Sequence, residues 1–245
     1  MDPAIVIGCY RLTDFIRLNL VLCQHLWPDS PILLSDDRSP ESPQIEQLAE
    51  EFGVAYMVSA RRRTHVSGDW QAFINGAQLG LETRRPVLKL SQRFIPVSER
   101  FWPLLQEDYQ GVTAVLPGKL NTSMIARPEA RFYLTFGHLT DCLLFDPTVY
   151  TPTLLQEAYN MGYHTGRKGD LFSELAWGRL IRLHPVKISP WLANHQPMER
   201  KLYLRKATAN AAEYQALAEA HGVQGVWDVR EWKAIEGQNY RSIPK

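Results

Sequence analysis

The stretches AIVIGCYR (residues 4–11) and ILLSDDRS (residues 32–39) carry the strongest indication of the fold of this chain. Each begins as a short aliphatic run, rich in β-branched residues in the first case, and ends in polar residues. An uninterrupted apolar run of this length is typical of a strand buried on both faces of a parallel sheet. Between the two runs, apolar residues recur at helical spacing from Phe15 to Leu26, after a capping pair at Thr13 and Asp14. The chain therefore opens in the order strand, helix, strand.

The same alternation continues to about residue 90. A second helical pattern begins at Ser42-Pro43 and stops at Gly53. Three further elements follow: a strand over 54–58, a helix over 70–81 and a strand over 86–90. Four alternations with short connections predict an α/β fold with a doubly wound, mostly parallel sheet flanked by helices. In such sheets ligands bind beyond the carboxyl ends of the strands, so we expect the functional residues there.

The pattern is looser after residue 110. We expect strands over 112–116, 142–145 and 186–189, helices over 154–160 and 171–183, and a last helix over 211–221 that Gly222 ends. No linker is long enough to separate two domains cleanly. The predicted organisation is one domain over 1–190, with halves 1–120 and 121–190, and a C-terminal helical extension over 191–245 packed on it.

Composition limits the classes of function. The chain of 245 residues has 27 Lys and Arg against 26 Asp and Glu, so a dedicated nucleic-acid coat is not expected. A nucleic-acid interface would rest only on Arg61–Arg63 and Arg84-Arg85, without a recognisable binding module. Three cysteines without a paired spacing favour a reducing compartment and argue against a Cys-based zinc site. No leader pattern and no apolar run of about 18 residues is present, so we expect a cytoplasmic protein without a transmembrane segment. Peripheral membrane contact stays open.

The common nucleotide-binding and hydrolase motifs are absent. The sequence contains no G-x-G-x-x-G, no complete P-loop, no G-x-S-x-G and no H-E-x-x-H, and its seven histidines are scattered. These absences argue against a dinucleotide-binding site, a P-loop NTPase, an α/β-hydrolase and a His-based metal site.

Four motifs in register resemble family 2 glycosyltransferases. The first strand is followed by Tyr10-Arg11, where the family has Tyr-Asn, and the second ends in Asp36-Asp37-Arg38-Ser39, which is similar to the family's Asp-Asp-x-Ser. SGDWQAFINGA (67–77) is similar to the family's small-residue helix bearing an Asn, and VLKLSQRFIP (87–96) stands at its fourth strand and D-x-D motif. The resemblance covers about residues 4–96 and fades through 190.

The resemblance implies a GT-A fold, a nucleotide-diphosphate sugar as donor, and inverting transfer to a hydroxyl of a glycan or glycolipid acceptor. The reaction would belong to glycan or cell-surface polysaccharide synthesis, and Asp37 would accept a hydrogen bond from the nucleobase. The alternative for 36–40 is a turn that is merely rich in Asp and Ser. The residues assigned to donor binding are Gly8, Tyr10, Arg11, Asp36, Asp37, Asn75, Ser91 and Arg93.

The D-x-D position departs from the family. Its two carboxylates would hold a divalent metal, but Ser91 and Arg93 stand there, and a hard cation prefers carboxylate oxygens. A guanidinium can neutralise a diphosphate instead, so we expect no metal and no cofactor, with Arg93 supplying the charge, helped by Lys89 or the Arg61–Arg63 run. The alternative is a catalytically silent nucleotide-sugar-binding domain that acts through a partner.

Inverting transfer needs a general base, which in the family opens a helix of the second half. The segment 168–180 resembles that helix, and it offers Glu174 as first choice and Asp170 as second. Asp170 is equally well explained as a helix-capping acid, and Asp141 is a third candidate. Trp102, Trp177 and Trp191 could stack on sugars, although aromatic residues of this kind more often belong to the core.

Overall fold

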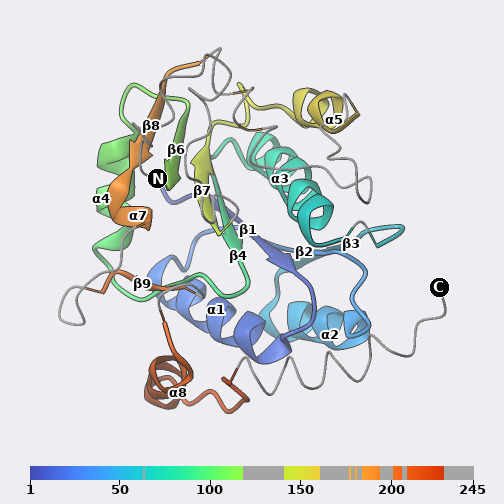
Figure 1. The fold of residues 1–245 in the computed structure, drawn as a ribbon, viewed down its shortest axis with the longest axis vertical. Coiled ribbons are helices and arrows are strands. Elements are labelled where there is room, and N and C mark those ends of the chain that lie inside the picture. Colours follow the sequence, from blue (N-terminus) through green and yellow to red (C-terminus); the bar gives the residue numbers. More distant parts are fainter. Residues whose placement is uncertain are drawn as a thin grey trace, which may run out of the picture.

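The fold was analysed in a computed structural model of the chain. It describes residues 1–62, 64–117, 141–160, 177, 180, 184–193, 201–205 and 209–228. A seven-stranded sheet crosses the middle of the molecule, with helices on both of its faces (Figure 1). The α/β class expected from the alternating pattern is confirmed.

The strands follow the order β3-β2-β1-β4-β7-β6-β8 across the sheet. Strands β1 to β4 are parallel to one another, β7 is antiparallel to both β4 and β6, and β8 is parallel to β6. Their bounds are β1 Ala4–Cys9, β2 Ile32–Asp36, β3 Ala55–Val58, β4 Val87–Ser91, β6 Ala114–Pro117, β7 Cys142–Phe145 and β8 Val186–Ser189. The sheet is therefore mostly parallel, as expected, with one reversed strand that the apolar pattern alone did not indicate.

Alternate residues of the strands supply two apolar layers. Helices α1 (Thr13–Leu26), α2 (Ser42–Phe52) and α4 (Phe101–Tyr109) pack on one layer, while α3 (Thr64–Thr83) and α5 (Pro152–Asn160) pack on the other (Figure 1). Within β1, for example, Ile5 and Ile7 join the first layer and Val6 the second. A side chain at Gly76 of α3 would place its Cβ 2.5 Å from a methyl carbon of Val6, so glycine lets α3 approach the sheet closely.

The C-terminal part packs around α1. Strand β9 (Tyr203–Leu204) pairs with β5 (Ile95–Pro96), after a short helix α7 (Pro190–Ala193). The predicted helix after residue 210 is α8 (Ala211–Ala220). It begins with a capping box formed by Asn210 and Glu213. Its Tyr214 and the following Trp227 lie edge-on to Phe15 of α1, with ring centroids 4.9 and 5.2 Å apart.

Three helices differ from the sequence prediction or lie outside what the structure describes. Helix α4 was not expected; its only proline, Pro103, lies in the first turn, where the missing N–H costs no hydrogen bond. Leu12 occupies the N-cap of α1 and no side chain caps it, whereas the carboxylate of Asp14 accepts the N–H of Val226 at 2.9 Å. The helix expected over 171–183 lies outside the described residues except for Trp177 and Leu180.

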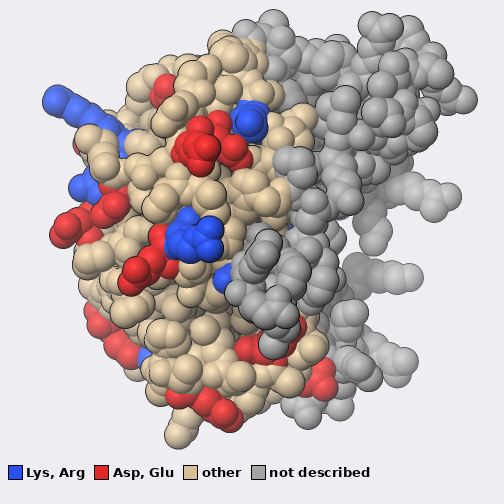
Figure 2. Space-filling view, turned by 90° about the vertical axis from the view of Figure 1, so that its left-hand side faces the viewer, with Lys and Arg blue, Asp and Glu red and all other residues tan. Residues whose placement is uncertain are grey.

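The surface over α4 carries no block of one charge. Acidic and basic side chains are interspersed among the described residues of this face (Figure 2). A surface that tracks a nucleic acid needs clustered basic groups, and this face does not offer them. No helix of the described residues has the length and apolar character needed to cross a bilayer.

Candidate active site

Four strands bring polar residues to one edge of the sheet. Strands β1, β2 and β4 end there, and because β7 runs in the opposite direction, it begins there. Gly8 lies opposite both Ser35 and Ser91, and Leu90 lies opposite Cys142. We call this the carboxyl edge: the residues that follow β1, β2 and β4 and the one that precedes β7.

The loops after β1 and β2 are held in an unusual backbone conformation. Arg11, Leu12 and Arg38 have φ of 56°, 58° and 52°, in the left-handed region. For residues with a side chain this costs roughly 1–2 kcal/mol each. The two loops support each other, since the Arg11 N–H donates to Ser39 Oγ at 2.9 Å. Strain of this kind tends to gather at functional sites, where the surroundings fix it.

Asp36 shapes the second loop. Its side chain is buried and accepts three hydrogen bonds: from the Ser39 N–H at 2.9 Å, from the Tyr56 hydroxyl at 3.0 Å, and from the Ser42 hydroxyl. These bonds fix the turn that presents the next residue, Asp37. The expected contact of Asp36 with a donor remains a prediction, and the contacts described here are internal.

Asp37 is fixed between β1 and α3. Its N–H donates to the Cys9 carbonyl at 3.1 Å, and its side chain is 7% exposed. A Cβ at Gly68 would lie 2.5 Å from Asp37 Cγ and 2.6 Å from its Oδ2. The carboxylate therefore occupies space that only a glycine in α3 leaves open. Gly68 stands in the motif at 67–77, but nothing in the sequence indicates its contact with Asp37.

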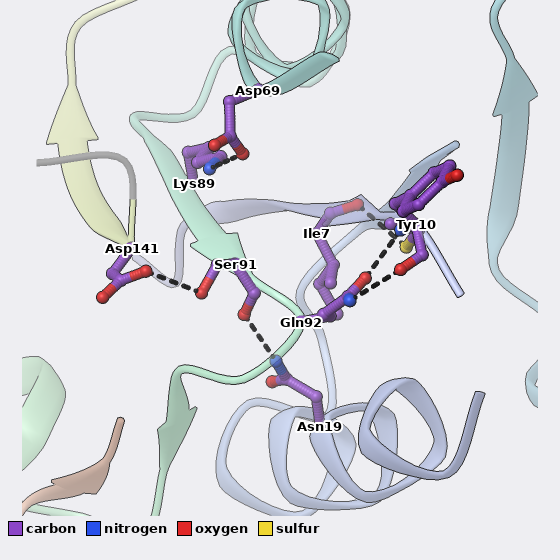
Figure 3. Close-up of polar contacts among 9 residues, drawn as sticks. Ile7, Tyr10, Asn19, Asp69, Lys89, Ser91, Gln92 and Asp141 are labelled. Atoms are coloured by element: carbon purple, nitrogen blue, oxygen red, sulfur yellow. Dashed lines mark hydrogen bonds and ion pairs between the residues drawn. The ribbon is translucent and has the colours of Figure 1, made fainter. Parts of the chain in front are cut away.

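Gln92 joins the ends of β1 and β4. Its side-chain amide accepts the Tyr10 N–H at 2.6 Å and donates to the Tyr10 carbonyl at 2.8 Å (Figure 3). The Arg62 guanidinium lies 4.5 Å from the centre of the Tyr10 ring, and that of Arg11 lies 5.6 Å from it. Sequence reasoning gave Gln92 no role of its own, although its place between Ser91 and Arg93 marked it.

Asn19 holds the loop after β4 from below. Its amide donates to the carbonyls of Ser91 at 3.3 Å and Phe94 at 3.0 Å, and it is fully buried in α1 (Figure 3). Sequence reasoning missed this residue too. The available signal was a polar residue among the apolar positions of an amphipathic helix.

A buried ion pair lies under the edge on the α3 side. Lys89 Nζ is 2.8 Å from Asp69 Oδ1, with the lysine side chain fully buried (Figure 3). Gly8 lies against this pair, and a Cβ there would be in ordinary contact with it, 3.4 Å from the Asp69 oxygen. Nearby, Asn75 donates to Ser35 Oγ at 2.9 Å and so joins α3 to β2. Direct contacts of Gly8 and Asn75 with a donor remain predictions.

Ser91 contacts a carboxylate from the neighbouring strand. Its hydroxyl donates to Asp141 Oδ1 at 3.2 Å, and its N–H donates to the Asp141 carbonyl at 2.7 Å (Figure 3). The other carboxylate oxygen, Oδ2, lies 3.6 Å from Arg205 Nη2. Arg205 is 2% exposed and follows β9 directly, and its Nη1 donates to the Leu192 carbonyl at 3.0 Å. Arg93 takes part through its carbonyl, which accepts the Tyr214 hydroxyl at 2.7 Å.

The described residues offer few other chemical groups at this edge. Among them, no cluster of three or more His, Cys, Asp and Glu side chains could hold a metal. Burial raises the pKa of the Cys9 and Cys142 thiols, and the nearby charges of Asp36 and Asp141 respectively raise them further. These thiols are therefore protonated near neutral pH and poor nucleophiles.

The candidate bases and tryptophans have different outcomes. Glu174 and Asp170 lie outside the described residues. Asp141, the third candidate, lies at the carboxyl edge. Trp102 and Trp177 belong to the core, the latter fully buried, which confirms the core alternative for both.

No protein-family model matches the sequence, and no curated protein matches it. Solved structures do match. A cytidylyltransferase from Leptospira borgpetersenii has a TM-score of 0.51 and 12% identity over 98% of this chain and 96% of its own. TarS from S. aureus has a TM-score of 0.49 and 10% identity over 91% of this chain and 39% of its own. Glucosyl-3-phosphoglycerate synthase from Mycobacterium tuberculosis has a TM-score of 0.42 and 15% identity over 60% of this chain and 57% of its own.

The likeness to the cytidylyltransferase extends over nearly the full length of both chains. At 12% identity it concerns the fold. With the mostly parallel seven-stranded sheet and its flanking helices, it confirms the expected GT-A-type fold.

Proposed function

We propose that this chain is a glycosyltransferase that moves a sugar from a nucleotide-diphosphate donor to a hydroxyl acceptor, with inversion and without a metal. The observation that carries the proposal is the fixed position of Asp37. Strained loops, a bond to β1 and a glycine in α3 together hold one carboxylate at the carboxyl edge. A fixed carboxylate is suited to recognise the N–H of a base, because it needs no ordering when the ligand binds.

The donor would lie across the ends of β1, β2 and β4. Asp37 accepts a hydrogen bond from the nucleobase. The ring of Tyr10 offers an aromatic surface beside it, and Gln92 fixes the backbone of Tyr10 through two hydrogen bonds. The diphosphate then lies toward Ser91 and Arg93. A guanidinium matches phosphate oxygens in its planar fork, and Ser91 and Arg93 do not suit a hard cation.

The chemical step is a displacement at the sugar's anomeric carbon. The acceptor oxygen forms the new bond while the bond to the diphosphate breaks, and the nucleoside diphosphate leaves with that electron pair. The acceptor's proton passes to a carboxylate, a contribution of about 10²- to 10⁴-fold in rate. Glu174 is the first candidate for this base, followed by Asp170 and Asp141. The acceptor is a glycan or glycolipid, in glycan or cell-surface polysaccharide synthesis.

A second candidate is a nucleotide-sugar-binding domain without catalysis. The contact of Asp141 with both Ser91 and Arg205 favours it, because these contacts engage both oxygens of a candidate base. Transfer in the presence of an acceptor would separate the two candidates.

A thermal-unfolding screen tests donor binding first. Nucleoside diphosphates and their sugars are added to the whole chain, each with and without EDTA. We expect at least one of them to raise the unfolding temperature equally in both conditions, since binding to the native state alone stabilises it. If none does, or if every shift needs a divalent cation, the proposal is wrong.

A further inference from the structure

Arg205 is a buried charge that the proposed reaction has not yet used. An arginine is cationic at any physiological pH, and removing it from water is expensive unless other groups compensate. Arg205 is nonetheless 2% exposed, held by the Leu192 carbonyl on one side and facing Asp141 on the other. Replacing such a pair by apolar residues often leaves stability unchanged, so stability alone does not explain it.

The position of this guanidinium is informative. Asp141 links it to the end of β4: one carboxylate oxygen lies 3.2 Å from Ser91 Oγ and the other lies 3.6 Å from Arg205 Nη2. The carboxylate of Asp141 therefore lies between Arg205 and Ser91, the position where the D-x-D resemblance would place a metal ligand. It comes from the far end of the sequence, through the pairing of β9 with β5.

The contact between Arg205 and Asp141 is also loose. Charge-assisted hydrogen bonds between guanidinium and carboxylate are typically about 2.7–2.9 Å long, often in a two-bonded fork. At 3.6 Å the two groups balance each other's charge without closing such a fork. A phosphate oxygen, which carries the same charge as a carboxylate, could take over the guanidinium.

Resting on the proposed function, we propose that Arg205 is a second cation, besides Arg93, that binds the donor's diphosphate, and that Asp141 balances its charge until the donor arrives. The diphosphate then competes with Asp141 for the guanidinium. The two residues therefore have opposite effects on diphosphate affinity: Arg205 raises it, and Asp141 lowers it.

The test measures binding of inorganic pyrophosphate and of uridine diphosphate by calorimetry in EDTA, at low salt. Arg205→Gln should weaken both by about ten- to a hundredfold, the range of one hydrogen bond to a charged group. Asp141→Asn should strengthen both several-fold, because it removes the competing charge. Arg17→Gln is the matched control, since it breaks another arginine–carboxylate pair, with Glu51, on the exposed side of α1 and α2. It should change neither affinity by more than about twofold.

The opposite signs distinguish this role from a structural one. If Asp141→Asn weakens pyrophosphate binding, or if Arg205→Gln leaves it unchanged, the inference is wrong. Failure of the wild-type chain to bind pyrophosphate at millimolar concentration also overturns it. Should Arg205→Gln not fold, Asp141→Asn decides: stronger pyrophosphate binding supports the inference, and weaker or unchanged binding overturns it. Pyrophosphate binding with these signs but without any nucleotide binding would support Arg205 while refuting the proposed donor.

Discussion

A methyl group at Gly68 should disable nucleotide binding without harming the fold. Gly68 lies in α3, and a Cβ there would lie 2.5 Å from Asp37 Cγ and 2.8 Å from its Cβ. Real Cβ atoms do not come closer than about 3.0 Å to such atoms, so in Gly68→Ala the Asp37 side chain must leave its position. Alanine also favours a helix over glycine by about 0.5–1 kcal/mol, which offsets part of the cost of the displacement.

The expected loss is that of the hydrogen bond that the Asp37 carboxylate accepts from the nucleobase. A bond to a charged group contributes roughly 1.5–3 kcal/mol, or about ten- to a hundredfold in affinity. We therefore expect Gly68→Ala to bind the nucleoside diphosphate ten- to a hundredfold more weakly than wild type. The free energy of unfolding should change by no more than about 1 kcal/mol.

A double-mutant cycle gives the decisive control. Calorimetry compares the wild type, Gly68→Ala, Asp37→Ala and the double variant, with denaturant unfolding of each. If Gly68 acts through Asp37, its substitution should have no further effect on affinity once Asp37 is alanine. Additive losses, or unchanged affinity in a folded Gly68→Ala protein, would refute the reasoning. Gly76→Ala is the contrasting variant: its Cβ meets Val6 of the core, so it should lower stability instead.

Four further predictions concern stability and catalysis. Asp69→Asn removes the negative charge that faces buried Lys89, and it should lower the free energy of unfolding in urea by about 3 kcal/mol. This value is at the lower end of the range for a broken buried ion pair, because Asp69 is partly exposed. An unchanged free energy of unfolding would contradict the pairing. Tyr214→Phe removes the bond to the Arg93 carbonyl and should cost about 0.5–1.5 kcal/mol in the same assay. The three buried cysteines have raised pKa values, so above about pH 8.5 their thiols stay protonated in the folded chain and ionise in the unfolded chain. The free energy of unfolding should therefore fall there with rising pH, by up to about 1.4 kcal/mol per pH unit for each thiol. A free energy of unfolding that stays constant from pH 8 to 10 would contradict this. Glu174→Gln should lower kcat at least about a hundredfold with donor affinity unchanged, and a smaller effect would transfer the role to another carboxylate.

The first half of the fold could be predicted because its signals are local. The strand runs at 4–8 and 32–34 are apolar on both faces, and the helix between them has regular spacing and clear ends. Their alternation restricts the topology to a parallel sheet, and the polar residues after each strand then fall at one edge. The positions of Tyr10, Asp37 and Ser91 at that edge follow from this reasoning.

The residues that sequence reasoning missed depend on contacts between distant segments. Gln92 and Asn19 act through hydrogen bonds to backbone atoms of other elements, and such bonds leave no periodic pattern. Arg205 reaches the edge because two residues of β9 pair with β5, a strand too short to give a sequence signal. The reversed direction of β7 was hidden for a similar reason, since a buried strand has the same composition in either direction.

Hydrogen exchange can show both whether a nucleotide sugar binds without metal and where on the chain it binds. The whole chain is exchanged in EDTA with and without the nucleotide sugar that gives the largest thermal shift. We predict that the nucleotide sugar slows exchange of the backbone amides over 10–12, 36–39 and 91–94, the loops of the carboxyl edge. Protection elsewhere with these loops unchanged, or protection that appears only when Mn²⁺ replaces EDTA, would contradict it.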